Sequence, residues 1–139
     1  MLRIGIVGVD STHTRANASI LNGGQVNGAR CVALWGHDRG LAEELARELG
    51  IAQVVERPED LLGVVDAVMI CDRYGEAHFA HARPFVEAGC PTYVDKPMTD
   101  RLDEAQALVQ MAKERGARLM SGSSLRFAPA VLSLKERMP

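Results

Sequence analysis

The sequence of 139 residues contains few cysteines, no excess of basic residues and no long hydrophobic run. Its three cysteines, Cys31, Cys71 and Cys90, are odd in number and far apart, which fits buried thiols in a reducing cytoplasm better than a disulfide framework or a zinc site. A formal net charge of −2 gives no indication of a nucleic-acid or membrane-surface partner. No apolar run reaches the roughly 18–20 residues of a membrane span, and the run at residues 2–9 breaks too early for a signal peptide. We therefore expect a cytoplasmic protein.

The rest of the composition is that of one globular domain. Hydrophobic residues make up 47% of the chain and charged residues 24%, as in soluble globular proteins. The length is enough for one hydrophobic core, and the chain contains no internal repeat, low-complexity tract or linker. We expect residues 1–139 to form a single domain.

Short apolar runs alternate with segments of helical periodicity along the whole chain. Most of the runs are continuous, which is typical of strands that are covered on both faces. Strands are expected at Leu2–Val9, Arg30–Trp35, Gln53–Val55, Ala67–Cys71, Thr92–Val94 and Ala117–Ser121. Helices are expected at Thr12–Asn22, Leu41–Leu49, Pro58–Leu62, Ala77–Ala88, Leu102–Ala112 and Pro129–Met138.

Strand–helix alternation predicts an α/β fold with a parallel sheet and right-handed crossovers. Six strands in this rhythm favour the doubly wound, Rossmann-like order 3-2-1-4-5-6. Ligands of such sheets bind outside the carboxyl ends of the strands. The residues that carry function should therefore come directly after each apolar run.

The turn after the first strand differs from a dinucleotide fingerprint, Gly-x-Gly-x-x-Gly. Gly8 is present, but Asp10 holds the second glycine position and His13 the third. A carboxylate there repels a pyrophosphate by ~1–4 kcal/mol at contact distance. The N-terminus of the next helix still faces the site, and a protonated His13 would offset Asp10. In the alternative interpretation, Asp10 or Ser11 only caps the helix and His13 packs against it. The cofactor-binding candidates in this turn are Gly8, Val9, Asp10, Thr12 and His13.

The turn after the second strand also departs from the usual pattern. An acid at the strand end normally bonds the ribose hydroxyls of NAD. Gly36 takes this position and Asp38 comes two residues later. A small residue followed by Arg39 would admit the extra phosphate of NADP. Alternatively, Asp38 is the N-cap of the following helix. We take His37, Asp38 and Arg39 as cofactor-binding candidates.

Polar residues also follow the fourth and fifth strands. Cys71 and Asp72 would border a nicotinamide or its ribose, although Asp72 and Arg73 fit a solvated surface pair equally well. His81 fits a packing role better than a role in the site. After the fifth strand, Asp95 and Lys96 would bind a sugar hydroxyl or polarise a carbonyl, and a surface ion pair would have the same sequence.

Several spaced motifs together resemble one known family. Asp95-Lys96-Pro97 is similar to the Glu-Lys-Pro motif of the Gfo/Idh/MocA oxidoreductases. His78 and Glu87-Ala88-Gly89 correspond to the "H…EAG" helix of that family. Gly122–Pro129, with Arg126, is similar to its "G-H-x-x-R-F-x-P" segment, with Ser123 in place of the histidine. The resemblance covers the whole chain.

The resemblance implies a function for these positions. Members of the family bind NAD or NADP in this domain and transfer hydride to or from a carbinol carbon of a sugar, polyol or related small molecule. The family's motif lysine touches substrate, which makes Lys96 the candidate catalytic residue. The preceding acid contacts the cofactor, which assigns Asp95 to cofactor binding, and the matched motifs add His78 and Arg126. Family members continue into an antiparallel-sheet domain with most of the substrate pocket and usually an acid–base histidine. We expect that second domain to be absent here.

Three functional hypotheses follow. The first is the cofactor domain of an NAD(P)-dependent oxidoreductase, either a fragment or a short form that works with another protein chain or a second copy of itself. The second is a non-enzymatic binding or scaffold module in which the dinucleotide motifs have decayed. The third is a divalent-metal site, because nitrogen and oxygen ligands converge on one sheet edge. Its ligands would be Asp10, His13, His37, Asp38 and Asp72.

Overall fold

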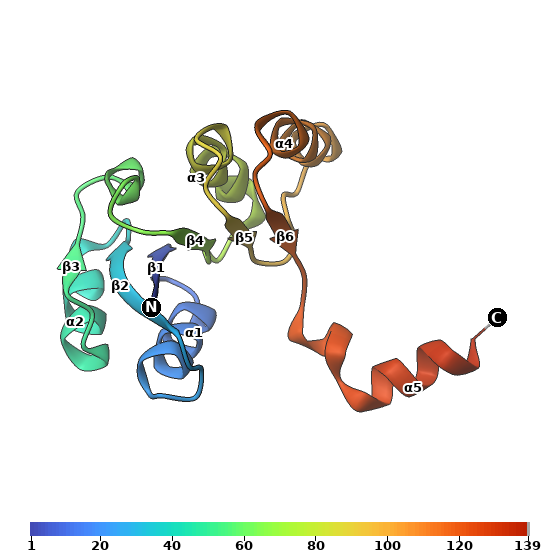
Figure 1. Cartoon of the computed structure of the whole chain (residues 1–139), viewed down its shortest axis with the longest axis horizontal. Coiled ribbons are helices and arrows are strands. Elements are labelled where there is room, and N and C mark those ends of the chain that lie inside the picture. Colours follow the sequence, from blue (N-terminus) through green and yellow to red (C-terminus); the bar gives the residue numbers. More distant parts are fainter. Residues whose placement is uncertain (139) are drawn as a thin grey trace.

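The computed structural model describes residues 1–138 as a six-stranded parallel sheet with helices on both faces (Figure 1). The strands are β1 (Leu2–Val7), β2 (Ala29–Trp35), β3 (Gln53–Val54), β4 (Ala67–Ile70), β5 (Thr92–Val94) and β6 (Leu119–Ser121). Their order is β3-β2-β1-β4-β5-β6, and each neighbouring pair is parallel. The predicted doubly wound α/β fold and its strand order are confirmed.

The helices follow the predicted alternation with two differences, at Pro58–Leu62 and at Ser124–Phe127, where no helix was predicted. They are α1 (Thr12–Asn22), α2 (Arg39–Leu49), the 3-10 helix η1 (Pro58–Leu61), α3 (Gly75–Glu87), α4 (Leu102–Arg115), the 3-10 helix η2 (Ser124–Phe127) and α5 (Pro129–Arg137). The helix predicted at Pro58–Leu62 is only the four-residue turn η1, because Leu62 is already extended. The Arg57 amide donates to Asp60 Oδ2 at 3.0 Å and the Asp60 amide donates to the Arg57 carbonyl at 3.1 Å, and these two bonds close the turn.

Two hydrophobic clusters, one on each face of the sheet, form the core. Successive residues of a strand point to opposite faces, so Ile6 and Val7 of β1 belong to different clusters. Ile6 packs with Leu34 and with residues of α1 and α2. Val7 packs with Phe85 of α3 and with residues of η1 and α4. All four side chains are fully buried, and burial of such side chains contributes about 1.5–3 kcal/mol each.

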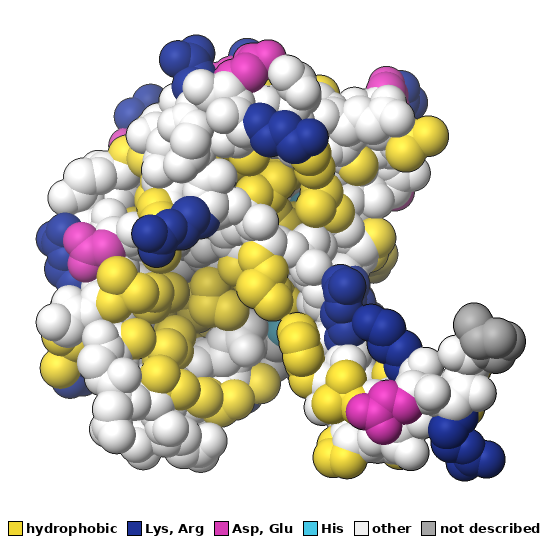
Figure 2. Space-filling view, turned by 45° about the vertical axis from the view of Figure 1, so that its right-hand side comes forward, with side chains coloured by type: hydrophobic (Ala, Val, Ile, Leu, Met, Phe, Trp, Pro, Cys, Tyr) yellow, Lys and Arg dark blue, Asp and Glu magenta, His cyan; other side chains and the backbone are white. Residues whose placement is uncertain are grey.

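The last helix stands apart from this core. Among the described residues, α5 has its principal contacts with η2, and it projects away from the sheet (Figure 1). Hydrophobic side chains are exposed on the side of the molecule from which it projects (Figure 2). An apolar hollow of about 610 Å³ lies against β4, β5 and β6. No helix of the described residues is long and apolar enough to cross a membrane.

Candidate functional site

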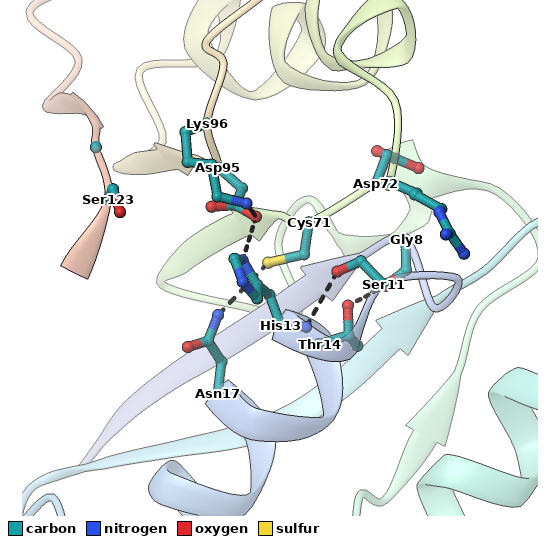
Figure 3. A network of polar contacts seen from close by, with 12 residues as sticks. Gly8, Ser11, His13, Thr14, Asn17, Cys71, Asp72, Asp95, Lys96 and Ser123 are labelled. Carbon is teal, nitrogen blue, oxygen red and sulfur yellow. Dashed lines mark hydrogen bonds and ion pairs between the residues drawn. The ribbon is translucent and has the colours of Figure 1, made fainter. Parts of the chain in front are cut away.

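A polar pocket of about 230 Å³ opens at the carboxyl edge of the sheet, where ligands of doubly wound folds bind. Three loops form it: the β1–α1 turn, the segment after β4 and the segment after β5. Figure 3 shows their side chains facing one another across the end of β1. We call this the edge pocket; it is lined by Asp10, Ser11, Thr12, His13, Asp72, Arg73, Asp95 and Lys96.

The β1–α1 turn is built around Gly8. Its φ of +93° lies in the left-handed region, and a Cβ at this position would lie 2.6 Å from the Asp72 amide nitrogen. Glycine is therefore required for the turn to approach the segment after β4. Thr14 closes the turn, since its hydroxyl donates to the Gly8 carbonyl at 2.8 Å.

Ser11 caps α1, and its Oγ accepts a hydrogen bond from the His13 amide at 3.2 Å. Of the two predicted caps, the structure therefore selects Ser11. Asp10 has another partner, since its Oδ1 accepts from the Arg73 amide at 3.2 Å. This bond joins the first turn to the segment after β4, so the two loops form one wall of the edge pocket.

The His13 side chain crosses to the opposite wall of the pocket. Its Nδ1 lies 2.5 Å from Asp95 Oδ2, and the Asp95 residue is 4% exposed. This contact contradicts the interpretation that His13 only packs against its own helix. Lys96 Nζ is 3.6 Å from the same carboxylate oxygen. Asp95 therefore lies between His13 and Lys96, and Figure 3 shows the three side chains in contact.

Tyr93 contacts the same network. Its hydroxyl donates to the Gly122 carbonyl at 2.8 Å and lies 3.4 Å from Asp95 Oδ1. Burial, followed by the charge of Asp95, raises the pKa of Tyr93, so the hydroxyl stays protonated as a donor. Tyr93 is not among the site residues predicted from the sequence. Its position two residues before Asp95 on β5 was a usable signal, because residues i and i+2 of a strand point to the same face.

Asp72 is also held in place, by two histidines of α3. His81 Nδ1 lies 2.8 Å from Asp72 Oδ2, and the His81 ring packs edge-on against Trp35 at 5.0 Å between centroids. His78 is fully buried, with Nε2 2.9 Å from the Asp72 carbonyl and Nδ1 2.7 Å from the Pro97 carbonyl. The structure thus gives His78 no opening to a ligand. Instead it joins the loop after β4 to the loop after Lys96.

The candidates at the end of β2 lie outside the edge pocket. Asp38 Oδ1 accepts from the Leu41 amide at 3.0 Å, so Asp38 is the N-cap of α2, as its alternative interpretation predicted. Arg39 forms ion pairs with Glu43 and Glu56. His37 is exposed, with its ring 6.5 Å from that of Trp35.

Two further candidates are not brought to the pocket. Cys71 is fully buried and accepts a hydrogen bond from Asn17 at 3.7 Å. Burial raises the pKa of its thiol to about 12, so the thiol stays protonated at neutral pH. Arg126 lies in η2, exposed to solvent. Its motif matched, but η2 leaves the sheet edge towards α5, so the side chain does not line the pocket.

A match over most of the chain decides the family. Residues 2–123 match the Gfo/Idh/MocA family, described as an oxidoreductase family with an NAD-binding Rossmann fold. The chain belongs to the Gfo/Idh/MocA family.

Several relatives are dehydrogenases. The inositol 2-dehydrogenase of Paracoccus denitrificans is 29% identical over 142 residues, which is 97% of this chain and 40% of that protein. The scyllo-inositol 2-dehydrogenase (NAD(+)) of Bacillus subtilis is 35% identical over 118 residues, which cover 81% of this chain and 33% of that protein. The structure of UDP-N-acetylglucosamine 3-dehydrogenase from Acidithiobacillus ferrooxidans matches with a TM-score of 0.84 and 30% identity, covering 98% of this chain and 41% of that one. The chain thus spans about 40% of the length of such relatives.

The edge pocket suits part of the cofactor that the Gfo/Idh/MocA family binds. The N-terminus of α1 faces the pocket, where it can receive a diphosphate, and Gly8 lets the turn before it pack against the segment after β4. Lys96 supplies a cation on the opposite wall. The adenosine end fits less well. Gly36 provides no carboxylate for a ribose, and Asp38 is occupied as a helix cap. The Asp10 carboxylate also lines the pocket and repels a diphosphate, so the fit of the diphosphate rests on the N-terminus of α1. The adenosine portion finds no carboxylate partner.

The metal hypothesis has no geometric support in residues 1–138. No group of three or more His, Cys, Asp or Glu side chains is placed there to hold a metal ion. Its proposed ligands divide between two places, because His37 and Asp38 lie beyond the end of β2 while Asp10, His13 and Asp72 line the edge pocket.

Proposed function

We propose that this chain is the cofactor-binding domain of an NAD-dependent oxidoreductase that acts on a hydroxyl group of a sugar, polyol or related small molecule. The observation that carries the proposal is the placement of Lys96 beside the buried Asp95, on the edge pocket and opposite the N-terminus of α1. Half of the Lys96 side chain is exposed, so its ammonium group can reach a ligand.

In this proposal Lys96 donates a hydrogen bond to the reacting oxygen of the substrate. Asp95 holds the Lys96 ammonium in place and accepts from a ribose hydroxyl. The backbone at the N-terminus of α1 receives the diphosphate. A bound nicotinamide supplies the hydride chemistry, which none of the side chains can supply themselves. The relatives are about two and a half times as long as this chain. The action on a substrate hydroxyl is therefore proposed for the whole protein and not for these residues alone.

The choice of NAD over NADP rests on Arg39. This residue is the one cation of the β2–α2 turn that could meet a 2′-phosphate, and its guanidinium group already pairs with Glu43 and Glu56. A phosphate would have to compete with both carboxylates. NAD, which carries hydroxyls at this position, has no such competition.

Titration of the chain with NADH and NADPH, followed by nucleotide fluorescence and by the emission of Trp35, tests the proposal. Trp35 is the single tryptophan, and it packs against His81, whose Nδ1 contacts Asp72 of the edge pocket. We expect saturable binding of NADH and weaker binding of NADPH. Binding of neither nucleotide would contradict the proposal and favour a scaffold module. Tighter binding of NADPH would contradict the choice of NAD.

A further inference from the structure

His13 and Asp95 together have the geometry of an acid–base dyad. Asp95 is buried at the base of the edge pocket, whereas 42% of the His13 side chain is exposed at its mouth. We propose that His13 Nε2 is the nitrogen that exchanges a proton with the hydroxyl group of a ligand in this pocket, and that Asp95 orients the ring for this task. The inference rests on the proposed function and adds a catalytic residue within the cofactor-binding domain itself.

The contact at Nδ1 fixes the form of the ring. An ionised carboxylate only accepts hydrogen bonds, so the neutral imidazole carries its proton on Nδ1, towards Asp95 Oδ2. Nε2 then presents its lone pair, and in residues 1–138 no side chain or backbone group is hydrogen-bonded to it. A general base has this arrangement: a carboxylate orients an imidazole, and the free Nε2 of that imidazole faces the ligand.

The other histidines lack this combination. Both ring nitrogens of the buried His78 face backbone carbonyls. His81 also pairs with a carboxylate, but it packs against Trp35 and does not line the pocket. His37 lies beyond the end of β2. Of the four histidines, His13 alone lines the edge pocket. Lys96 lines the pocket on the side opposite the N-terminus of α1.

In this step a proton and a hydride leave the same carbinol group of the ligand. The O–H bond of the ligand's carbinol group breaks and its proton goes to Nε2, which leaves an imidazolium beside the Asp95 carboxylate. The C–H bond of the same carbon breaks with both electrons, and this hydride reduces the oxidised NAD of the proposed function. The oxygen remains as a carbonyl that accepts a hydrogen bond from Lys96. The imidazolium then returns its proton to solvent at the open mouth of the pocket.

The dyad itself is tested by nitrogen NMR of the labelled chain, with no activity required. We expect neutral His13 to carry its proton on Nδ1. In Asp95→Asn the side-chain amide can donate to Nδ1, so the ring proton should move to Nε2. A wild-type ring protonated on Nε2 overturns the dyad. The wild-type result decides the question even if the variant does not fold.

The catalytic use of the dyad is tested with NAD⁺ and three probe substrates: myo-inositol, scyllo-inositol and UDP-N-acetylglucosamine. We expect His13→Ala to lower turnover by about 10²–10⁴-fold, to change the dissociation constant of NADH by less than about threefold, and to recover part of its turnover in added imidazole. His37→Ala is the matched control and should change none of these.

The outcomes separate the two proposals. Equal losses of NADH affinity and turnover in His13→Ala, or no recovery in imidazole, would overturn the role of His13 as the base. A wild-type chain that oxidises none of the probes would also overturn that role for this chain. A wild-type chain that does not bind NADH would overturn the proposed function, while the NMR result would still decide the dyad.

Discussion

Val9 fills the space in which a side chain at position 36 would stand. A Cβ built on Gly36 would lie 2.2 Å from Val9 Cγ2 and 2.7 Å from Val9 Cγ1. Val9 is 5% exposed and belongs to the core cluster that faces α1 and α2. The unusual turn after β1 and the missing acid after β2 are therefore linked, because the buried Val9 excludes a ribose-binding carboxylate at position 36.

The contact between Val9 and Gly36 predicts that position 36 does not accept a side chain, and so does not accept an acid, without loss of stability. Gly36→Ala should lower the free energy of unfolding by about 1–3 kcal/mol, as expected for overpacking, when measured by urea denaturation. The matched control is Gly122→Ala, whose Cβ would have nothing closer than 3.9 Å, and it should stay within about 0.5 kcal/mol of the wild type.

The double variant Val9→Ala/Gly36→Ala measures the coupling directly. Removing the two methyl groups of Val9 opens the space that the new Cβ needs, so the double variant should be more stable than the sum of the single changes by about 0.5–3 kcal/mol. Strict additivity of the three unfolding free energies would contradict the proposed contact.

Gly8 offers a second prediction, which separates backbone strain from steric exclusion. Gly8 and Gly24 have φ angles of +93° and +79°, but only Gly8 has a close neighbour, the Asp72 amide at 2.6 Å from a built Cβ. Gly24→Ala should cost roughly 1–2 kcal/mol for the left-handed backbone alone. Gly8→Ala should cost about 1–3 kcal/mol more and weaken NADH binding. Equal losses of stability in the two variants would show that the approach of Asp72 is not tight.

The ion pair between Arg3 and Asp66 predicts a pH dependence of stability. The Arg3 guanidinium lies 2.7 Å from Asp66 Oδ1, and the Arg3 amide also donates to this carboxylate at 2.8 Å. These hydrogen bonds lower the pKa of Asp66 from 3.8 to about 2. Because the folded-state pKa is depressed, the stabilisation is fully present above the unfolded value and is lost as the pH falls from 3.8 to about 2.

Urea denaturation of the wild type and Asp66→Asn over this range checks the sign. The wild type should be the more stable protein at neutral pH, and the difference should shrink below about pH 4 and vanish near pH 2. Asp100→Asn removes an exposed acid that forms no salt bridge in the described residues, and it is the matched control for loss of one negative charge away from the Arg3–Asp66 pair. A difference for Asp66→Asn that grows on acidification would have the wrong sign.

The sequence predicted the sheet well and the site only in part, for physical reasons. Continuous apolar runs and periodic stripes are local signals, so the strands and most of the helices could be placed from them. The contact between His13 and Asp95 joins residues 82 positions apart, and no local pattern encodes it. Asp38 shows a different limit. A turn with a carboxylate before a helix has the same sequence whether the carboxylate caps the helix or binds a ribose. The bond from the Leu41 amide to Asp38 shows that this carboxylate caps the helix.

Lys96 provides the most direct prediction for the proposed function. In the proposed function, its ammonium stabilises the charge that develops on the reacting oxygen and does not hold the diphosphate. Lys96→Ala should therefore lower turnover with NAD⁺ and the probe substrates by about 10²–10³-fold, while the dissociation constant of NADH changes little. Lys113→Ala, on the exposed end of α4, is the matched control for loss of one positive charge. If Lys96→Ala lost NADH affinity in proportion to turnover, the lysine would be a cofactor ligand and its assigned role in the reaction would be wrong.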